Sequence, residues 1–447
     1  MKSKAKKLVG MLLVLVMMLS LAACGGKDKD ESTGGSGGKS DDVTTIKITW
    51  WGSDARHAYT QELLDLYTEK NPNIKFEATP SGWDGYFDKL STQAASGSMP
   101  DIIQMDYGYI ATYSTNNSLA DMTEFIDDGT IDVSSIEDTI LSSGEIDGKV
   151  TGIPAASTML AVNYNPVAIE AAGATAPTDD WTWEDYIAMN KKVSEKTGQP
   201  SALNSITGAF GNVNLLNYWV RQQGEVLYNE DNTALGYDDD ELTASYFQMW
   251  ADMAKDGVAP DPDQQSQLAS VGKESLPIME DQAASTIEWN NFASMMSGSN
   301  DTLKLALMPE SKENNALWLK PSMFLSIAEN SKVKEEAAKF IDWFINSEEA
   351  NDIIAAERGT PISAKVREYM VASGKMTPQQ EEMFEYTDKV AEIAGDCPPA
   401  DPNGQAEIDE AFANAGNSVM YGEATAKEAA KTFRTQANEI LERNNKK

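Results

Sequence analysis

The residues between 45 and 105 alternate between two hydrophobic periods, and this alternation restricts the fold more than any other feature. Ile46–Trp50 alternates polar and apolar residues as a strand does, and Ile74–Glu77 and Ile102–Met105 are shorter segments rich in strand formers. Between them, Ala58–Lys70 and Trp83–Ala95 carry apolar residues at helical spacing. Short links between alternating strands and helices favour parallel strands joined by right-handed crossovers. The sequence therefore predicts an α/β fold.

The pattern changes after residue 150. Thr151–Asn165 is an extended apolar run that contains a proline. The chain has 447 residues, of which 41% are hydrophobic, and this is enough for two or three domains with real cores. Helices are predicted at 183–197, 213–223, 241–255, 333–345, 378–394, 406–421 and 425–444, and further extended stretches at 284–289, 303–308 and 317–327.

The first residues have the pattern of an export signal. Four lysines precede an apolar stretch, which is shorter than the roughly 20 residues needed to span a bilayer. Leu21-Ala22-Ala23-Cys24 resembles the lipobox of bacterial lipoproteins, in which the cysteine becomes lipidated. Residues 24–43 are rich in Gly, Ser and charge, so they cannot bury enough surface to become ordered. We expect a signal peptide at 1–23, and a lipidated cysteine with a flexible tether at 24–43.

Several classes of function are disfavoured by the composition. The formal net charge is −34, whereas nucleic-acid binding needs clustered Lys and Arg. His57 is the only histidine, which excludes multi-histidine metal sites. Cys397 is the only cysteine beyond Cys24, so no disulfide is expected within the mature chain. We expect no cofactor, no metal site and no catalytic residues, although the many carboxylates leave a glycan-active enzyme open as an alternative.

Three turns after predicted strands concentrate aromatic and polar side chains. Trp50–His57 follows the first strand, Ser81–Asp84 precedes the second helix, and Asp106–Tyr109 follows the third strand. Ligands of open α/β sheets bind outside the carboxyl ends of strands. Strand alternation places one of the first two tryptophans in the core, and we expect Trp51 to face the ligand.

These residue types suit sugars. A pyranose has an apolar face that stacks on aromatic rings and a rim of hydroxyl groups that carboxylates, amides and guanidinium groups satisfy. Asp106 has the acceptor capacity for two hydroxyl groups, with a helix cap as the alternative role. Trp83 is a candidate platform, with surface packing as its alternative.

Taken together, segments along nearly the whole mature chain resemble the extracellular solute-binding lipoproteins of bacterial ABC importers, in the sugar-binding branch. The segments that carry the resemblance are Ile48–Pro80, Pro100–Ile103, Gly152–Pro154 with Leu160–Asn165, Trp181–Asp185, Lys320–Ala328, Ala337–Phe340 and Arg358–Pro361.

The resemblance implies a two-lobe clamp of the periplasmic-binding-protein type. Each lobe would have a central sheet flanked by helices, and hinge segments near 154–158, 323–327 and 360–363 would cross between the lobes. Lobe 1 would comprise 44–156 with 324–361, and lobe 2 would comprise 157–323 with 362–447. Such clamps close around a ligand by hinge motion.

The resemblance also implies a set of ligand-binding residues. They are Trp51, Ser53, Arg56, Trp83, Asp106, Tyr107, Tyr109, Phe210, Asn212, Trp289, Asn290, Met323 and Phe324.

The expected function is capture of a carbohydrate, a di- or oligosaccharide, and its delivery to the permease subunits of an ABC importer. The protein would be a monomer outside the cytoplasm, held by lipid to the outer face of a Gram-positive membrane. A non-sugar solute remains open: carboxylates around Asp106 would suit a polyamine, and an acidic sugar would need Arg56 or Lys320 exposed in the cleft. A peptide is a further alternative.

Overall fold

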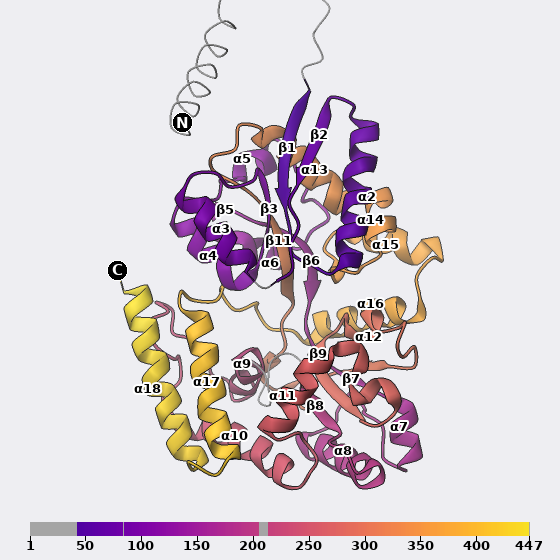
Figure 1. The fold of residues 1–447 in the computed structure, drawn as a ribbon, viewed down its shortest axis with the longest axis vertical. Helices are drawn as coiled ribbons and strands as arrows, with labels where there is room; N and C mark the ends of the chain where they lie inside the picture. The colour runs from indigo at the N-terminus through magenta and orange to yellow at the C-terminus, as the bar shows by residue number, and fades with distance from the viewer. Residues whose placement is uncertain (1–42, 84, 205–212, 447) are drawn as a thin grey trace, which may run out of the picture. The chain divides into compact units, whose positions relative to one another are not determined.

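The computed structural model describes residues 43–83, 85–204 and 213–446, and two separate sheets organise this part of the chain (Figure 1). The first sheet has six strands in the order β12-β6-β11-β3-β1-β2. Their bounds are β1 Thr44–Thr49, β2 Ile74–Ala78, β3 Ile102–Met105, β6 Ile153–Thr158, β11 Lys320–Ile327 and β12 Thr360–Pro361.

The N-terminal part of this sheet is parallel, as the alternating pattern predicts. β1 pairs with β2 on one side and β3 on the other, both in parallel, and helices α2 (Asp54–Lys70) and α3 (Tyr86–Ala95) make the crossovers. The second helix begins at Tyr86 and not at Trp83. Gly85, with φ of 74°, adopts the left-handed conformation at its N-cap, and this ends any helical path from Trp83.

The second sheet has four strands in the order β10-β7-β9-β8. β7 lies antiparallel to both β9 and β10, whereas β8 is parallel to β9. In Figure 1 this sheet occupies the lower part of the picture, below the six-stranded sheet. The strands are β7 Leu160–Tyr164, β8 Ala202–Asn204, β9 Ser285–Trp289 and β10 Lys304–Ala306, and a separate hairpin pairs β4 Glu145–Ile146 with β5 Lys149–Val150.

Helices surround both sheets, and none of the described ones is both long and apolar enough to cross a membrane. The helix predicted from residue 183 is confirmed, with Thr182 and Asp185 forming a capping box at its start. The remaining α-helices are α4 Tyr107–Thr115, α5 Thr123–Asp127, α6 Asp138–Leu141, α7 Pro166–Ala171, α8 Trp183–Thr197, α9 Val213–Gln222, α10 Asp240–Lys255, α11 Pro262–Val271, α12 Phe292–Met295, α13 Lys334–Asn346, α14 Glu348–Ile354, α15 Ala364–Ser373, α16 Pro378–Ile393, α17 Gln405–Met420 and α18 Ala426–Asn445.

The three segments expected to cross between lobes contribute to neighbouring strands of the first sheet. β11 lies between β6 and β3, and β12 lies on the other side of β6. Only Met159 separates β6 from β7, so the chain passes directly from the first sheet into the second at this point. The lobes are therefore connected through one edge region of the six-stranded sheet.

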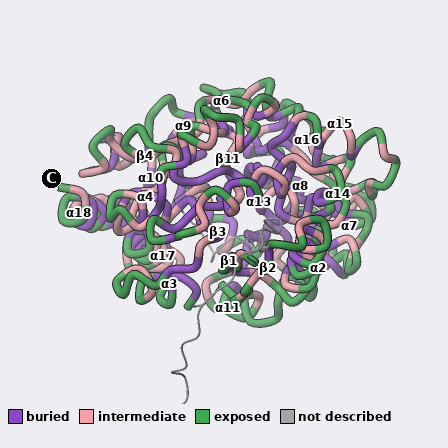
Figure 2. Tube along the Cα trace, turned by 90° about the horizontal axis from the view of Figure 1, so that it is seen from above, coloured by how far each residue is buried: buried purple, intermediate pink, exposed green. Residues whose placement is uncertain are grey.

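Each sheet has its own large hydrophobic core. One core gathers residues from β1–β3, β6, β11 and α13, and the other gathers residues from β7, α8–α10, α17 and α18. Leu319 and Cys397 are partly buried and pack against both cores. Figure 2 shows buried positions in the interior near β11 and exposed positions along the outer helices. The two-lobe α/β fold is confirmed.

Phe324 lies at the centre of the first core and provides a test of it. The side chain is fully buried in β11, and its ring lies 6.0 Å from that of Tyr107. We expect Phe324→Ala to lower the free energy of unfolding by about 3–5 kcal/mol, because the truncation leaves a cavity. Urea denaturation measures the loss. The control Val371→Ala, at a position 62% exposed, should change stability by less than about 0.5 kcal/mol.

Candidate functional site

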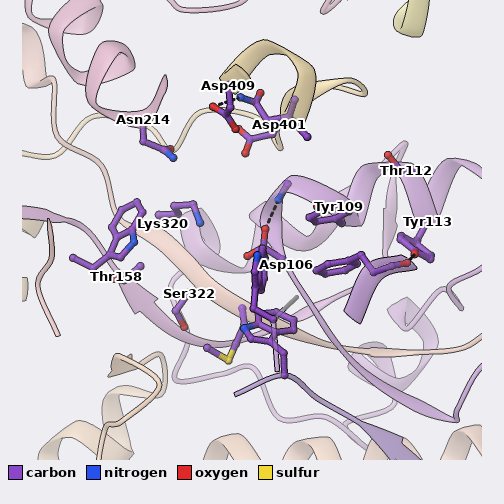
Figure 3. A pocket seen from close by; sticks show the side chains of 18 of the residues that line it. Asp106, Tyr109, Thr112, Tyr113, Thr158, Asn214, Lys320, Ser322, Asp401 and Asp409 are labelled. Carbon is purple, nitrogen blue, oxygen red and sulfur yellow. Dashed lines mark hydrogen bonds between the residues drawn. The ribbon is translucent and has the colours of Figure 1, made fainter. Parts of the chain in front are cut away.

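A cavity of 1590 Å³ lies between the carboxyl ends of β1 and β3 and the elements around the second sheet (Figure 3). Its wall includes residues from the loops after β1 and β3, from α3 and α4, from β11, from the end of β9, and from the segment that enters α17. Both lobes thus contribute side chains to one cavity. The position agrees with the rule that ligands bind beyond the carboxyl ends of strands.

The first lobe contributes an aromatic wall. The rings of Trp51 and Trp83 meet edge to face at 5.2 Å, and Tyr109 stacks on Phe87 at 3.6 Å with the ring planes 2° apart. Trp83 is 48% exposed, so its indole ring offers free surface to a ligand. Trp50 instead turns into the core, where its Nε1–H donates to Nδ1 of His57 at 3.1 Å. Both tryptophans are buried in the first core, and of the two only Trp51 also lines the cavity.

The opposite wall contains another indole ring and a buried lysine. Trp289 is the last residue of β9, and Lys320 begins β11. The Lys320 ammonium lies 5.3 Å from the ring centroids of both Trp289 and Tyr107. Nearby, Lys273 pairs with the buried carboxylate of Glu288 at 2.5 Å. This wall combines stacking surface with hydrogen-bond donors.

Arg56 forms part of a charged network in the cavity wall. Its Nε and Nη2 donate to the two carboxylate oxygens of Glu357 at 2.9 Å each, and the Tyr59 hydroxyl donates to Oε2 at 2.6 Å. Burial opposes ionisation of Glu357, but the Arg56 charge and these hydrogen bonds outweigh it and hold the pKa of Glu357 below its ordinary value. Glu357 thereby fixes the orientation of Arg56.

Asp106, Asp401 and Asp409 are among the carboxyl groups that line the cavity (Figure 3). Asp106 caps α4 by accepting from the backbone N–H of Gly108 at 2.9 Å and also lines the cavity, and its contact with a ligand stays a prediction. Burial raises the pKa of Asp401 to about 7, despite the opposing charge of Lys320. Burial also raises the pKa of Asp409 to about 6. A carboxyl group with such a pKa can donate as well as accept a hydrogen bond near neutral pH.

The predicted binding residues divide into three groups. Those in the cavity wall are Trp51, Ser53, Arg56, Trp83, Asp106, Tyr109, Trp289 and Met323. Those that the structure places outside this wall are Tyr107, Asn290 and Phe324. Those outside the described residues are Phe210, Asn212 and the lipidation candidate Cys24.

Local geometry explains why three of these residues lie outside the wall. Tyr107 and Tyr109 are two residues apart on α4, about 200° around the helix, so they face opposite ways. The Tyr107 hydroxyl donates to the carbonyl of Pro398.

Asn290 is fully buried, and its Oδ1 accepts from the Thr158 hydroxyl at 3.0 Å. A register shift between Met323 and Phe324 interrupts strand alternation and leaves only Met323 in the wall.

Several residues of the cavity wall are not among the ligand-binding residues predicted from the sequence. Asp401 belongs to a Pro-Asn-Gly turn sequence, which by itself indicates only a turn. The turn reaches the cavity because the chain is held on both sides, with the Thr112 hydroxyl donating to Asn403 Oδ1 and Arg221 Nη2 donating to the carbonyl of Asp396 at 3.0 Å. Such long-range contacts have no local signal. Within the described residues, no cluster of three His, Cys, Asp or Glu side chains suits a metal ion.

The raised pKa of Asp401 gives a pH-dependent contribution to stability. Its carboxyl binds its proton more tightly in the folded than in the unfolded chain, so its contribution is complete below about pH 4 and is lost as pH rises through about 7. Between about pH 4 and about pH 7, the free energy of unfolding should therefore fall less for Asp401→Asn than for the wild-type protein. Urea denaturation across a pH series measures it. The matched charge removal Glu69→Gln, at an exposed position on α2, should leave the slope unchanged.

Comparisons with known proteins agree with this architecture. A structure of an extracellular solute-binding protein family 1 member from Alicyclobacillus acidocaldarius is 30% identical, with a TM-score of 0.68, and the alignment covers 90% of this chain and 100% of that one. The oligogalacturonide binding protein of Yersinia enterocolitica, solved with saturated digalacturonic acid, is 25% identical with a TM-score of 0.78, over 89% of this chain and 99% of that one.

Among curated proteins, the diacetylchitobiose binding protein DasA of Streptomyces coelicolor is 26% identical over 43% of this chain and 44% of its own length. The matched stretch thus spans less than half the length of the curated relatives. The model of the family described as bacterial extracellular solute-binding protein matches residues 62–384. That match covers well over half of the chain, and the chain therefore belongs to the bacterial extracellular solute-binding protein family.

Proposed function

We propose that this protein captures an oligosaccharide between its two lobes and delivers it to the permease of an ABC importer. The observation that carries the proposal is the composition of the interlobe cavity. Trp83 on one side and Trp289 on the other provide stacking surfaces, the buried Trp51 lines the wall beside Trp83, and charged side chains line the same cavity. Relatives that bind diacetylchitobiose and digalacturonic acid support a carbohydrate ligand.

The aromatic rings and polar groups of the cavity wall suit a sugar. The C–H face of a pyranose packs on an indole ring, while hydroxyl groups accept from Arg56 or Lys320 and donate to Asp106. The cavity volume of 1590 Å³ exceeds the roughly 300–1,000 Å³ typical of small-ligand pockets. A ligand of two or more sugar units is therefore the better fit. We expect binding without turnover.

The proposed route of delivery depends on the N-terminal segment. Cys24 would carry lipid and hold the protein at the outer face of a Gram-positive cell membrane, with residues 25–43 as the tether. A tether raises the effective concentration of the receptor at its permease without any new contact. A monomer suffices for this function, because one cavity contains side chains from both lobes of one chain.

Ligand binding should be visible as stabilisation. An oligosaccharide at 100 times its Kd raises the free energy of unfolding by about 2.7 kcal/mol, since it binds only the folded state. A thermal-shift screen of mono- and oligosaccharides therefore identifies the ligand. We expect Trp289→Ala to weaken binding of that ligand about 30-fold or more, as for loss of a contact of about 2 kcal/mol.

The matched control is Tyr421→Ala, which removes an aromatic ring that is 54% exposed and outside the cavity wall. It should leave the affinity unchanged. A panel in which polyamines or peptides shift the melting temperature and no saccharide does would contradict the carbohydrate proposal. Binding that survives Trp289→Ala intact would show that stacking on this ring is unimportant.

The anchor can be tested separately from the ligand. We expect Cys24→Ser to abolish incorporation of labelled palmitate in cells, because serine lacks the thiol that accepts the lipid. Cys397→Ser keeps that thiol and should label as the wild-type protein does. Equal labelling of the wild type and Cys24→Ser would refute lipidation at this residue.

A further inference from the structure

In the cavity wall that contains Trp289, Lys320 is the cation that lacks a counter-ion among the described residues. Its side chain lines the cavity, yet the residue is only 8% exposed. Within the described ranges the ammonium makes no ion pair and no hydrogen bond, and its contacts are the ring faces of Tyr107 and Trp289. Buried lysines are rare unless they are paired. This lysine therefore has three N–H donors available in a site from which most water is excluded.

Three other cations line the same cavity, and they are Arg56, Lys273 and Arg358. Within the described residues Arg358 makes no ion pair, but its guanidinium donates to Gln104 Oε1 and to the Thr60 hydroxyl. Lys273 pairs with Glu288 at 2.5 Å, and Arg56 pairs with Glu357 at 2.9 Å. Both of these charges are neutralised within the protein. The protein carries 70 acidic residues against 36 basic ones, so acidic partners are abundant in general. In the part of the chain that the structure describes, no acidic side chain forms an ion pair with Lys320.

The surrounding groups leave the ammonium charge uncompensated. The aromatic rings attract the cation but accept no conventional hydrogen bond, so they hold it in place without neutralising it. Asp401 is near enough for Lys320 to affect its titration, but burial raises the pKa of Asp401 to about 7, so it is only partly ionised at neutral pH. A buried charge without a partner costs free energy, which a ligand can recover by supplying the opposite charge.

We propose that Lys320 is a carboxylate subsite and that the captured solute is an acidic oligosaccharide containing uronic acid. This inference rests on the proposed function and specifies its substrate class. The carboxylate would accept from the Lys320 ammonium, while the sugar ring beside it stacks on Trp289. Hydroxyl groups of the same ligand would face Asp106 and Asp401, which lie around the same space (Figure 3).

A carboxylate suits this site better than a hydroxyl group. A hydroxyl oxygen accepts one hydrogen bond but leaves the positive charge unneutralised. An ammonium–carboxylate contact is charged on both sides, which makes it shorter and about twice as strong as a neutral hydrogen bond. Because Lys320 is buried, less water surrounds this contact than in bulk solvent, and the contact is stronger for that reason. The carboxyl groups near Lys320 then serve as hydrogen-bond partners for the hydroxyl groups.

The test compares acids with their neutral counterparts by isothermal titration calorimetry. The probes are 1,4-linked digalacturonate, diglucuronate and dimannuronate, each beside the same disaccharide with both carboxyl groups reduced to hydroxymethyl groups. We expect at least one acid to bind the wild-type protein about 10- to 150-fold more tightly than its reduced form, as for one hydrogen bond between charged groups.

Variants at Lys320 assign this preference to its charge. Lys320→Met should abolish the preference for the acid, so that the variant binds the acid and its reduced form with similar affinity. Lys320→Arg keeps the charge and should retain most of the preference. The control Lys191→Met removes an exposed lysine that pairs with Asp256 far from the cavity wall, and it should behave as the wild type does.

The outcomes distinguish this inference from the proposed function. If reduced or other neutral disaccharides bind as tightly as the acids, or if Lys320→Met weakens both forms equally, the carboxylate subsite is wrong and the carbohydrate function stands. If no saccharide binds, whether acidic or neutral, both proposals fail.

Discussion

The pairing of β11 with β3 and β6 is the constraint on which the rest of the structure depends. β11 comes more than 150 residues after β6 in the chain, yet it lies between β6 and β3 and is antiparallel to both. Because the segment between β6 and β11 builds most of the second lobe, closing this sheet forces the chain to leave the first lobe and return to it. The predicted hinge segments lie in the strands of this region, and their role as hinges stays a prediction.

The same strand also determines what the cavity contains. Lys320 lies opposite Thr158 at the end of β6, where the chain passes into the second sheet, so the first residue of β11 lies at the junction of the lobes. A register shift separates Met323 from Phe324; both side chains are buried in the first core, and only Met323 also lines the cavity. One strand thus provides a core residue, a cavity residue and a buried cation.

Local patterns were enough to predict much of the fold. The parallel strands β1 to β3 and the helix from Trp183 follow from hydrophobic period and capping residues, which depend on neighbours in the sequence. The cavity residues Trp51 and Asp106 follow from the rule about strand ends. The sequence places Tyr107 and Tyr109 in one predicted group. Their directions depend on where α4 starts within that turn, and spacing in the sequence does not reveal where the helix starts.

Non-local contacts account for the residues that sequence reasoning missed. Asp401 reaches the cavity only because the segment before α17 is held by Tyr107 and Thr112 of the first lobe and by Arg221 of the second. The Tyr107 ring also lies against the Lys320 ammonium. Tyr107 therefore influences both charged groups from behind the cavity wall, through the backbone that positions Asp401 and through its ring beside Lys320. Tyr107 thus contacts the surroundings of two groups that line the cavity, and its own contact with a ligand stays a prediction.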